Sequence, residues 1–440
     1  MTLEEIINNI DYTFLFNKKD IELGEFSKDT RTMNENDVYV AIKGENFDGH
    51  DFIMEAIKKK ASLIISEKEL PEEIISKNVP ILIVDNTIKT LQDIALYKRN
   101  KYDIPVIAIT GSVGKTSTKD MVSSIVSEEY KTLYTSGNYN NHIGLPLTIL
   151  KLKDHEALVV EMGMNHPHEI EVLSNIVKPT VAVITNIGTA HIGILKSREN
   201  ILKAKLEILS GLNGPLIINN DNDLLHEWNS KNKTIDVITY GINNKSDIMP
   251  SKIDKEEDYT KFNYKDQTFL VPVGGEHFLY NALCALAVGK VLNISLEKIK
   301  NGLENFKLSS NRMEIIKGSF TIIDDTYNAN YDSMVAALKY LDTLKGRKIA
   351  VLGDMLELGK YSKTIHKNIS KEINMLKLDV LITVGKESSI INKYVKIPNY
   401  HFQTNEEASE FINTIKHKND CILLKASNGM HFKEILEKIK

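Results

Sequence analysis

The sequence predicts an α/β protein of three domains, in which mostly parallel sheets are covered by helices. Short apolar runs typical of buried strands alternate with stretches of helical periodicity, and this alternation indicates parallel sheets. The length of 440 residues corresponds to about three domains of roughly 150 residues each. With 42% hydrophobic and 26% charged residues, the composition is that of a globular protein.

Residues 1–103 form the first predicted domain. The runs DVYVAI and ASLIIS are predicted strands, and DFIMEAIKKK between them is a predicted helix. The stretch KRNKYDIP (residues 98–105) is predicted to be a linker, because Pro105 disfavours a helix through that point.

Residues 104–311 form the second predicted domain. Its first strand is VIAIT, and the runs ALVVEMG, VAVITNIG and PLIINND are further strands. The helical stretches are TSTKDMVSSIVSEEY, ENILKAKLEILSGL and EHFLYNALCALAVGKVL. This order predicts a parallel sheet with helices on both faces, closing near Ser309.

Residues 312–440 form the third predicted domain. The runs FTIIDD, KIAVLGD, DVLITVG and CILLKAS are predicted strands. Helical patterns such as DSMVAALKYLDTL and HFKEILEKIK separate or follow them. The alternation and the size predict a Rossmann-like domain.

The segment TGSVGKTST, residues 110–118, has the features of a phosphate-binding loop. It follows a strand and precedes a helix, so its glycines would let backbone N–H groups point at phosphate oxygens. Lys115 could reach the β and γ phosphates, and the Thr116 hydroxyl could hold Mg²⁺. Only two residues separate Gly111 from Gly114, fewer than in the standard loop, so a simple strand–helix turn is the alternative. The complete order favours a central ATPase domain of the P-loop type.

Two further candidates lie at the ends of predicted strands. Glu161 ends ALVVEMG, and His191 follows VAVITNIG. Ligands of parallel sheets bind outside the carboxyl ends of the strands, so we expect both residues to converge on the phosphate loop. A carboxylate there suits Mg²⁺, whereas His191 taken alone is an ordinary loop histidine. Lys205 lies in a predicted helix, where a lysine is usually solvated.

The order of the motifs resembles the Mur ligase family of amide-bond-forming ATPases. The motifs that carry the resemblance are TGSVGKTST, EMGMNHPHEI, TNIGTAHIGILKSRENILKAKLEI, IIDDTYNANYDSM, VLGDMLELGKYS and, near the N-terminus, SKDTRTMNENDVYVAIKGENFDGHDF. The resemblance covers nearly the whole chain. It implies a UDP-sugar-binding domain, a central ATPase domain and a C-terminal Rossmann-like ligase domain.

The resemblance also implies a reaction. IIDDTYNANYDSM and VLGDMLELGKYS are most similar to the branch that joins D-alanyl-D-alanine to UDP-N-acetylmuramoyl-tripeptide, using ATP and Mg²⁺, in peptidoglycan precursor synthesis. The tripeptide carboxylate would attack the γ-phosphate to form an acyl phosphate, and the dipeptide amine would then displace phosphate. Metal ions and Lys115 would offset the repulsion between these anions.

Individual roles follow from the same resemblance. Thr116 and Glu161 would hold one Mg²⁺, and His191 with a carbamylated Lys205 would serve a second cation, so that Lys115, Glu161, His191 and Lys205 are the catalytic candidates. The nucleotide contacts would be Gly111, Ser112, Gly114, Lys115, Thr116, Ser117, Asn281, Arg312, Asp325, Tyr327, Asn328 and Asn330. The substrate contacts would be Thr30, Arg31, Asp48, Gly49, His50, Asn140 and Asn141.

Three positions depart from the family pattern. Phe278 and Tyr331 replace an asparagine and a proline, and Asn428 stands where an arginine is usual. An arginine offers a charged fork suited to a carboxylate, so the acceptor and the third peptide residue stay open. The alternatives are another ligase of the family, a paralogue with a different acceptor, and a catalytically silent nucleotide-binding homologue.

Composition excludes several other classes. With 55 Lys and Arg against 59 Asp and Glu, the net charge of −4 argues against a nucleic-acid partner. No apolar run is long enough to span a membrane, and MTLEEIINNIDY is not a secretory signal. The two cysteines, both in apolar runs, indicate a reducing compartment, so we expect a cytoplasmic enzyme, acting as a monomer.

Overall fold

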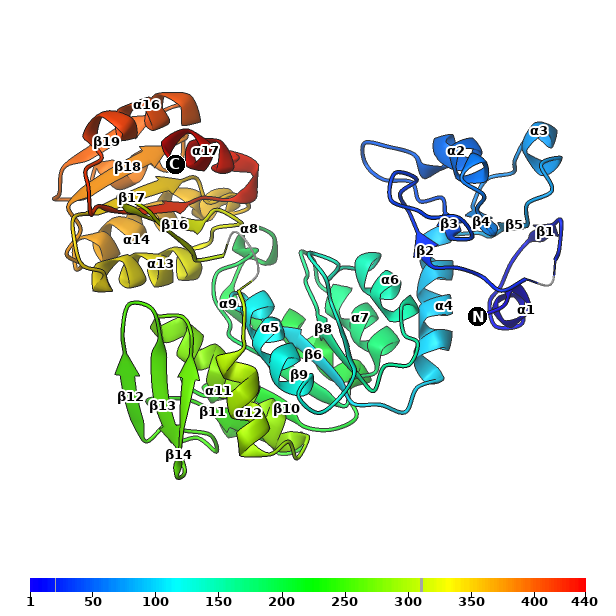
Figure 1. The fold of residues 1–440 in the computed structure, drawn as a ribbon, viewed down its shortest axis with the longest axis horizontal. Coiled ribbons are helices and arrows are strands. Elements are labelled where there is room, and N and C mark those ends of the chain that lie inside the picture. Colours follow the sequence, from blue (N-terminus) through cyan, green and yellow to red (C-terminus); the bar gives the residue numbers. More distant parts are fainter. Residues whose placement is uncertain (20, 309–311) are drawn as a thin grey trace.

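The computed structural model describes residues 1–19, 21–308 and 312–440. The predicted end of the central domain, from Ser309 to the 311/312 boundary, lies outside the described residues. Figure 1 shows three α/β domains, with the N-terminal and C-terminal domains standing apart above the central one. The predicted fold class is therefore confirmed. Within the described ranges, no helix combines the length and apolar character needed to cross a membrane.

The N-terminal domain is built on a five-stranded sheet of order β1-β5-β4-β3-β2. Its strands are parallel except at the edge, where β1 runs antiparallel to β5. Its elements are α1 (Leu3–Ile7), β1 (Phe14–Phe16), β2 (Phe26–Ser27), β3 (Val38–Val40), η1 (Gly49–Phe52), α2 (Ile53–Lys58), β4 (Leu63–Ser66), α3 (Glu72–Ile75) and β5 (Ile81–Ile83). Strands β3 and β4 are buried along their whole length, as expected of strands covered on both faces.

Helix α4 (Thr87–Asn100) joins this domain to the central one and corrects the predicted linker, because it continues through residues 98–100. Its last turn is anchored by Arg99, which is buried. The Arg99 guanidinium donates hydrogen bonds to the carbonyls of Val177 (2.8 Å) and Lys178 (3.3 Å) in the central domain. These contacts anchor the last turn of α4, so the helix ends at Asn100, only a few residues before Pro105.

The central domain contains a six-stranded parallel sheet of order β11-β10-β9-β6-β8-β7. Its strands are β6 (Val106–Thr110), β7 (Thr132–Tyr134), β8 (Ala157–Glu161), β9 (Val181–Ile184), β10 (Leu216–Asn219) and β11 (Val237–Tyr240). The connection from β6 leads to β7 and β8 on one side, and β9 returns to the other side. The strand order therefore reverses at β6, which is where open α/β sheets bind ligands.

Helices cover both faces of this sheet. Alternate residues of β6 enter two hydrophobic cores: Ile107 and Ile109 face one, Val106 and Ala108 the other. The helices are α5 (Lys115–Val126), α6 (Gly144–Leu150), α7 (Glu169–Val177), α8 (Ile192–Leu195), α9 (Arg198–Leu206), η2 (Glu207–Gly211), α10 (Asp223–Lys231), α11 (Glu276–Val291) and α12 (Leu296–Glu304).

A three-stranded antiparallel sheet between β11 and α11 was not predicted. It consists of β12 (Lys252–Lys255), β13 (Thr260–Tyr264) and β14 (Gln267–Val271). Phe262 and Phe269 are directly opposed across β13 and β14, with their rings stacked 5.3 Å apart. Both rings are buried and pack in the hydrophobic core of the central domain, so they hold the small sheet against that domain.

The C-terminal domain has a sheet of order β15-β16-β20-β17-β18-β19, parallel except for β15. The strands are β15 (Glu314–Lys317), β16 (Thr321–Asp325), β17 (Lys348–Gly353), β18 (Val380–Val384), β19 (Asn399–Phe402) and β20 (Cys421–Lys425). The helices are α13 (Tyr331–Thr343), η3 (Gly359–Tyr361), α14 (Ser362–Ile373), α15 (Ser389–Asn392), α16 (Asn405–Ile415), η4 (Asn428–Met430) and α17 (Lys433–Ile439).

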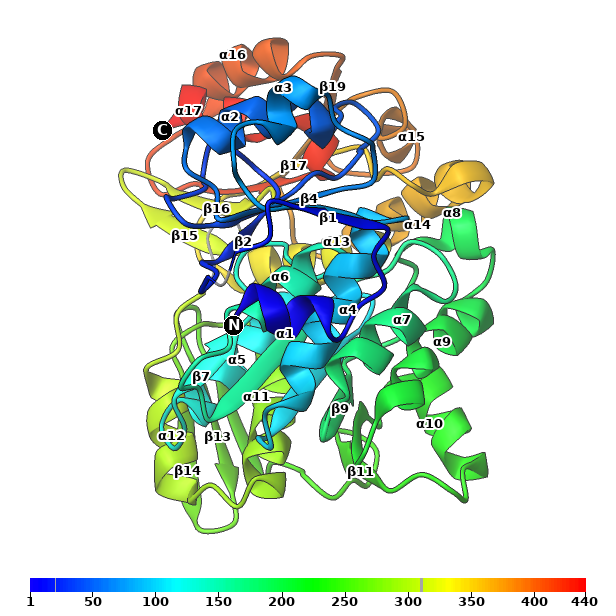
Figure 2. The same ribbon diagram turned by 90° about the vertical axis from the view of Figure 1, so that its right-hand side faces the viewer.

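The carboxyl ends of β16 and β20 are brought together by the register of the C-terminal sheet, which pairs Asp325 with Lys425. Both residues line the same cleft as Glu161, at the carboxyl end of β8 in the central sheet. The C-terminal domain lies over the central domain (Figure 2), so the ligand-binding edges of two sheets meet at one place.

Candidate functional site

The phosphate loop begins where β6 ends and closes where α5 begins. Gly111 and Gly114 have φ values of +155° and +79°, which side-chain-bearing residues rarely adopt. A Cβ atom on Gly111 would lie 1.9 Å from the Thr185 hydroxyl oxygen, so this position also lacks space for a side chain. The two glycines thus permit a tight turn that leads directly into the first turn of α5.

Asn186 braces this loop and was missed by the sequence analysis. Its Oδ1 atom accepts hydrogen bonds from the backbone N–H groups of Ser112 (3.0 Å) and Val113 (2.9 Å). The neighbouring Thr185 hydroxyl donates to the Val113 carbonyl at 2.7 Å. The signal was present in TNIGTAH, where two polar residues directly follow a buried strand.

Lys115 lies in the cleft beside the loop. Its Nζ donates to the Gly111 carbonyl at 2.9 Å, which folds the side chain back over the turn. Burial lowers the pKa of Lys115, and the positive charge of Arg312 lowers it further, whereas Glu161 opposes the shift. Lys115 and Arg312 both line the cleft, so two basic side chains lie where a polyphosphate could bind.

The Thr116 hydroxyl and the Glu161 carboxylate are the best-defined pair of oxygen groups in the cleft that could bind a metal ion. The Thr116 hydroxyl donates to Glu161 Oε2 at 2.7 Å, and Asn140 Nδ2 donates to Oε1 at 2.7 Å. Glu161 is 2% exposed. A hydroxyl and a carboxylate this close are hard oxygen ligands that fit a magnesium ion beside phosphates. In the described part of the chain, no cluster of three or more His, Cys, Asp or Glu side chains could hold a metal.

Asn141 has a local partner. Its Oδ1 atom accepts hydrogen bonds from the N–H groups of Ile143 (3.2 Å) and Gly144 (2.8 Å) at the start of α6. The side chain therefore shapes the turn between Asn140 and α6 as well as lining the cleft.

His191 is held at the edge of the cleft by the C-terminal domain. Its Nδ1 atom lies 3.0 Å from Glu357 Oε2. The pair is within ion-pair distance, although Nδ1 is buried without a properly oriented hydrogen bond among the described residues. The contact with His191 lowers the pKa of Glu357, which keeps the carboxylate ionised. Glu357 had no predicted role, although it lies in VLGDMLELGKYS.

Lys205 is buried, contrary to the usual expectation for a helical lysine. It lies in α9, is 2% exposed and lines the cleft, and no carboxylate of the described residues lies within ion-pair distance of it. Burial, together with the charge of Lys115, lowers the pKa of Lys205 well below its usual value. A neutral amine is therefore available at much lower pH than for a solvated lysine.

The C-terminal side of the cleft is basic and aromatic. The Arg312 guanidinium carbon lies 3.8 Å from the centre of the Tyr327 ring. Asp325 forms an ion pair with the buried Lys425, which also donates to the carbonyl of Asn328 at 3.1 Å. Lys425 had no predicted role beyond its place in the predicted strand CILLKAS, and the structure pairs it with a predicted site residue.

Asn330 and Asn281 have local partners of their own. The Asn330 side chain accepts from the N–H of Ser333 at 2.9 Å and caps α13. Asn281 is buried in α11, and its Oδ1 accepts from the Thr118 hydroxyl at 3.1 Å. Both residues line the cleft, so each can face a ligand only alongside these existing contacts.

The three departures from the family pattern differ in environment. Phe278 is 2% exposed and belongs to the core of the central domain. The Tyr331 hydroxyl donates to Glu372 at 2.9 Å, which ties the start of α13 to α14. Asn428 begins η4 and is exposed. Of the three, Phe278 is among the residues that line the cleft, whereas Tyr331 and Asn428 are not.

Most of the predicted site residues meet in this one cleft, whose volume is about 610 Å³. Those that line it are Ser112, Gly114, Lys115, Thr116, Ser117, Asn140, Asn141, Glu161, His191, Lys205, Asn281, Arg312, Asp325, Tyr327, Asn328 and Asn330. Gly111 does not line the cleft, but its backbone conformation permits the tight turn of the loop. The N-terminal candidates Thr30, Arg31, Asp48, Gly49 and His50 do not line the cleft.

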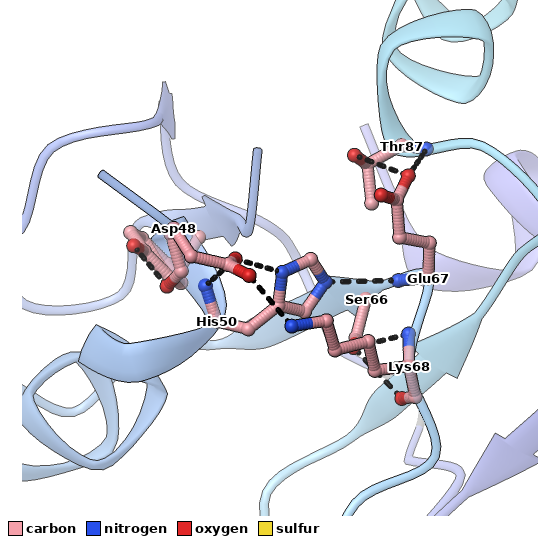
Figure 3. Close-up of polar contacts among 8 residues, drawn as sticks. Asp48, His50, Ser66, Glu67, Lys68 and Thr87 are labelled. Atoms are coloured by element: carbon pink, nitrogen blue, oxygen red, sulfur yellow. Dashed lines mark hydrogen bonds and ion pairs between the residues drawn. The ribbon is translucent and has the colours of Figure 1, made fainter. Parts of the chain in front are cut away.

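The N-terminal cluster, comprising Asp48, His50, Glu67 and Lys68, is a separate network (Figure 3). The Glu67 N–H donates to His50 Nε2 at 3.3 Å, so Nδ1 carries the ring proton and donates to Asp48 Oδ1 at 2.5 Å. Lys68 donates to the other oxygen of Asp48 at 2.6 Å. These bonds hold the pKa of Asp48 well below its usual range.

The remaining N-terminal candidates, Thr30, Arg31 and Gly49, have local contacts of their own. Gly49 has no room for a side chain, because a Cβ atom would lie 2.6 Å from the backbone nitrogen of Ile42. Thr30 is buried, and its carbonyl accepts from Lys59 at 2.5 Å. Arg31 is exposed and forms a 2.7 Å ion pair with Asp29, which lowers the pKa of Asp29 to about 2.

Family models match almost the whole chain. The Mur ligase family catalytic domain matches residues 26–99, the Mur ligase middle domain residues 109–289, and the Mur ligase glutamate ligase domain residues 311–428. The order of the three matches is the order of the three domains described above.

Curated relatives are similar over nearly their full length. A protein of Bacillus subtilis (strain 168) named UDP-N-acetylmuramoyl-tripeptide--D-alanyl-D-alanine ligase is 37% identical over 424 residues, covering 93% of this chain and 91% of that protein. The protein of the same name from Escherichia coli (strain K12) is 35% identical over 383 residues, with 85% and 84% coverage.

Solved structures share the whole fold. MurF from Acinetobacter baumannii superposes with a TM-score of 0.92 at 31% identity, covering 100% of this chain and 98% of that one. MurF ligase from Thermotoga maritima in complex with ADP has a TM-score of 0.83 at 30% identity, with 94% and 96% coverage.

Proposed function

This chain belongs to the Mur ligase family, and we propose that it joins D-alanyl-D-alanine to UDP-N-acetylmuramoyl-tripeptide with hydrolysis of ATP. The product is a precursor of peptidoglycan. The observation that carries this assignment is the cleft in which the phosphate loop, Glu161, His191 and Lys205 from the central domain meet Arg312 and Asp325 from the C-terminal domain. Relatives that carry this function are 31–37% identical over most of their length.

The first step transfers a phosphoryl group. The terminal carboxylate of the tripeptide attacks the γ-phosphate of ATP, the bond to the β-phosphate oxygen breaks, and an acyl phosphate and ADP result. Lys115 lies next to the loop that would hold the phosphates and would offset the charge of the two approaching anions. Thr116 and Glu161 would hold a magnesium ion, which supplies further positive charge when bound.

The second step forms the amide. The amine of the dipeptide attacks the acyl carbon, and phosphate leaves with the oxygen that came from the carboxylate. His191 and Lys205 would serve a second cation near the acyl phosphate. Because its buried amine has a strongly lowered pKa, Lys205 is suited to react with CO₂ and become a carbamate, an anionic oxygen ligand.

The remaining assignments divide the substrates among the domains. Thr30, Arg31 and the segment Asp48–His50 would contact the UDP-sugar, and Asn140 with Asn141 the muramoyl peptide. The nucleotide would contact the loop residues Gly111, Ser112, Gly114 and Ser117, together with Asn281, Arg312, Asp325, Tyr327, Asn328 and Asn330. Asp325 and Asn330 would act mainly through their ion pair and helix cap.

We propose domain boundaries at 103/104 and 311/312, a monomeric state and a cytoplasmic location. Each domain has its own sheet, which supports the first boundary. Two free, buried cysteines, Cys284 and Cys421, fit a reducing compartment. Sedimentation equilibrium of the purified protein tests the monomer, because a concentration-dependent mass would contradict it.

The function is tested by phosphate release. The purified protein is supplied with Mg²⁺, ATP and UDP-N-acetylmuramoyl-tripeptide, ending in diaminopimelate or in lysine, with and without D-alanyl-D-alanine. We expect release that requires the dipeptide and a product with the mass of the pentapeptide. If neither tripeptide supports release, the assignment fails.

An altered acceptor is the second candidate, because exposed Asn428 replaces the usual arginine. Other D-amino-acid dipeptides are then assayed in the same way. If Asn428→Arg restores use of D-alanyl-D-alanine, the residue determines acceptor choice. If no acceptor supports turnover but nucleotide binds, the chain is a silent homologue.

A further inference from the structure

The C-terminal domain contacts the loop that carries His191 at several points. Asp332, at the start of α13, accepts hydrogen bonds from the N–H (2.8 Å) and hydroxyl (3.0 Å) of Thr189. The Tyr361 hydroxyl donates to the Lys196 carbonyl at 2.6 Å. Residues 189–196 of the central domain are thus held at both ends by side chains from a different domain.

Between these two anchors the backbones are in close contact. A Cβ atom added to Gly193 would lie 2.3 Å from the Glu357 carbonyl oxygen and 2.8 Å from the Leu358 carbonyl carbon. Only a glycine permits this approach. The segment around Glu357 is therefore docked on α8, directly beside His191.

His191 and Glu357 both have backbone conformations that ordinary residues avoid. Their φ values are +62° and +63°, in the left-handed region. Such conformations persist where surrounding structure imposes them, and they are frequent at functional sites. Here they bring the His191 Nδ1 atom, which is buried, within 3.0 Å of Glu357 Oε2.

We propose that Glu357 is a positioning residue for His191, so that the C-terminal domain completes the cation site to which His191 belongs. A carboxylate at Nδ1 holds the proton on that nitrogen and leaves Nε2 as the nitrogen that can bind a cation. Removing such a partner typically weakens metal binding by about 10–100-fold. This inference rests on the proposed function, in which His191 serves the second cation.

The arrangement also couples chemistry to domain docking. His191 comes from the loop after β9, and Glu357 from the segment after β17, so neither domain alone can form the pair. Thr116 and Glu161, the pair that would hold the first cation, both lie within the central domain. The first cation site is therefore independent of Glu357, and the second depends on it.

The test is a Mn²⁺ titration of the full-length protein in the presence of ADP, followed by electron paramagnetic resonance. We expect two sites in the unaltered protein. Glu357→Ala and Glu357→Gln should lower the Mn²⁺ affinity of only the weaker site, the one to which His191 belongs, by about 10-fold or more. The affinity for ADP should stay unchanged. Glu357→Asp, which keeps the charge, should restore part of the affinity. The double variant His191→Ala/Glu357→Ala should bind Mn²⁺ like His191→Ala alone.

Controls separate this role from domain docking. Glu406→Gln, an exposed carboxylate paired with Lys438 on the same domain, should change nothing. Asp332→Asn loosens the same interface without touching His191. An equal loss of the weaker site in Asp332→Asn and Glu357→Gln would overturn the specific role of Glu357. So would unaltered Mn²⁺ affinity in a folded Glu357→Gln variant. A wild-type protein that binds two Mn²⁺ ions but catalyses no ligation would refute the proposed function alone.

Discussion

In the N-terminal cluster, the charged groups pair with one another, whereas in the cleft several do not. Asp48 receives hydrogen bonds from His50 and Lys68, and His50 uses both ring nitrogens. Among the described residues, Lys205 has no carboxylate partner, whereas His191 Nδ1 lies 3.0 Å from Glu357 Oε2. Burying a polar group without a partner costs free energy, so the environment of Lys205 is expected where a ligand supplies the missing partner. The side chains of the N-terminal cluster, in contrast, already have partners within their own domain.

The largest effect is expected for Lys115→Ala. Loss of the lysine that reaches back over the phosphate loop should lower kcat by about 10³-fold, because its charge would no longer offset that of the γ-phosphate in the proposed mechanism. The matched control is Lys98→Ala, another partly buried lysine with a lowered pKa, far from the cleft. Phosphate-release assays with circular dichroism check both variants. Near-normal turnover of folded Lys115→Ala would remove the phosphate-loop assignment.

The next largest effect is expected for Lys205→Ala. Loss of the proposed Lys205 carbamate should reduce ligation by about 10²-fold, and short carboxylic acids such as formate should restore part of it by supplying an oxygen ligand. Lys203→Ala, an exposed lysine of the same helix, is the control and should retain full activity. Unchanged activity of Lys205→Ala without added acid would exclude the carbamate role.

A change in the N-terminal cluster should act on stability. His50→Ala removes one of the hydrogen bonds to Asp48, which keeps its bond to Lys68, and leaves the Glu67 N–H without a partner, so the free energy of unfolding should fall by about 1–3 kcal/mol. At saturating substrates kcat should stay within about twofold, because the cluster is outside the cleft. Urea denaturation and steady-state kinetics check both quantities. A folded variant of wild-type stability and much lower kcat would contradict the contrast between the two regions.

The smallest effects are expected from pH and from the surface pair. Asp29 has a pKa of about 2 in the folded protein, and that of Asp48 is also lowered, against about 3.9 when unfolded. Their stabilisation is fully present above the unfolded pKa and is lost as the pH falls through the folded pKa, which is about 2 for Asp29 and well below the usual range for Asp48. The stability difference between Asp48→Asn and the wild type should therefore become smaller, without vanishing, from pH 7 to pH 3, and an undiminished difference in thermal midpoints would contradict this. Arg31→Ala should leave the thermal midpoint at pH 7 nearly unchanged, because its ion pair is exposed.

Local patterns in the sequence predicted much of the architecture. VIAIT, KIAVLGD and CILLKAS correspond to β6, β17 and β20, because buried parallel strands are continuous apolar runs. The small antiparallel sheet was missed, since two of its strands, KIDK and TKFNY, are polar and short. The linker predicted for residues 98–105 begins too early, because α4 continues to Asn100 and the burial of Arg99 depends on contacts with a distant segment.

The residues of the cleft also divide into those that the sequence could predict and those that it could not. Lys115 and Thr116 could be identified from a contiguous motif, and Glu161 from its place at a strand end. Glu357 and Lys425 could not, because their partners His191 and Asp325 come from remote segments and nothing in their own neighbourhoods indicates pairing. The burial of Lys205 could likewise not be predicted, since its helix mixes apolar residues with several charged ones and a lysine in such a helix is usually solvated.

The most direct test of the account follows an oxygen atom. UDP-N-acetylmuramoyl-tripeptide labelled with ¹⁸O in its terminal carboxylate is incubated with the protein, Mg²⁺, ATP and D-alanyl-D-alanine, and the released phosphate is analysed by mass. An acyl phosphate predicts one ¹⁸O atom in each phosphate molecule. Unlabelled phosphate, released at the rate of ligation, would contradict the mechanism and the role given to the cleft.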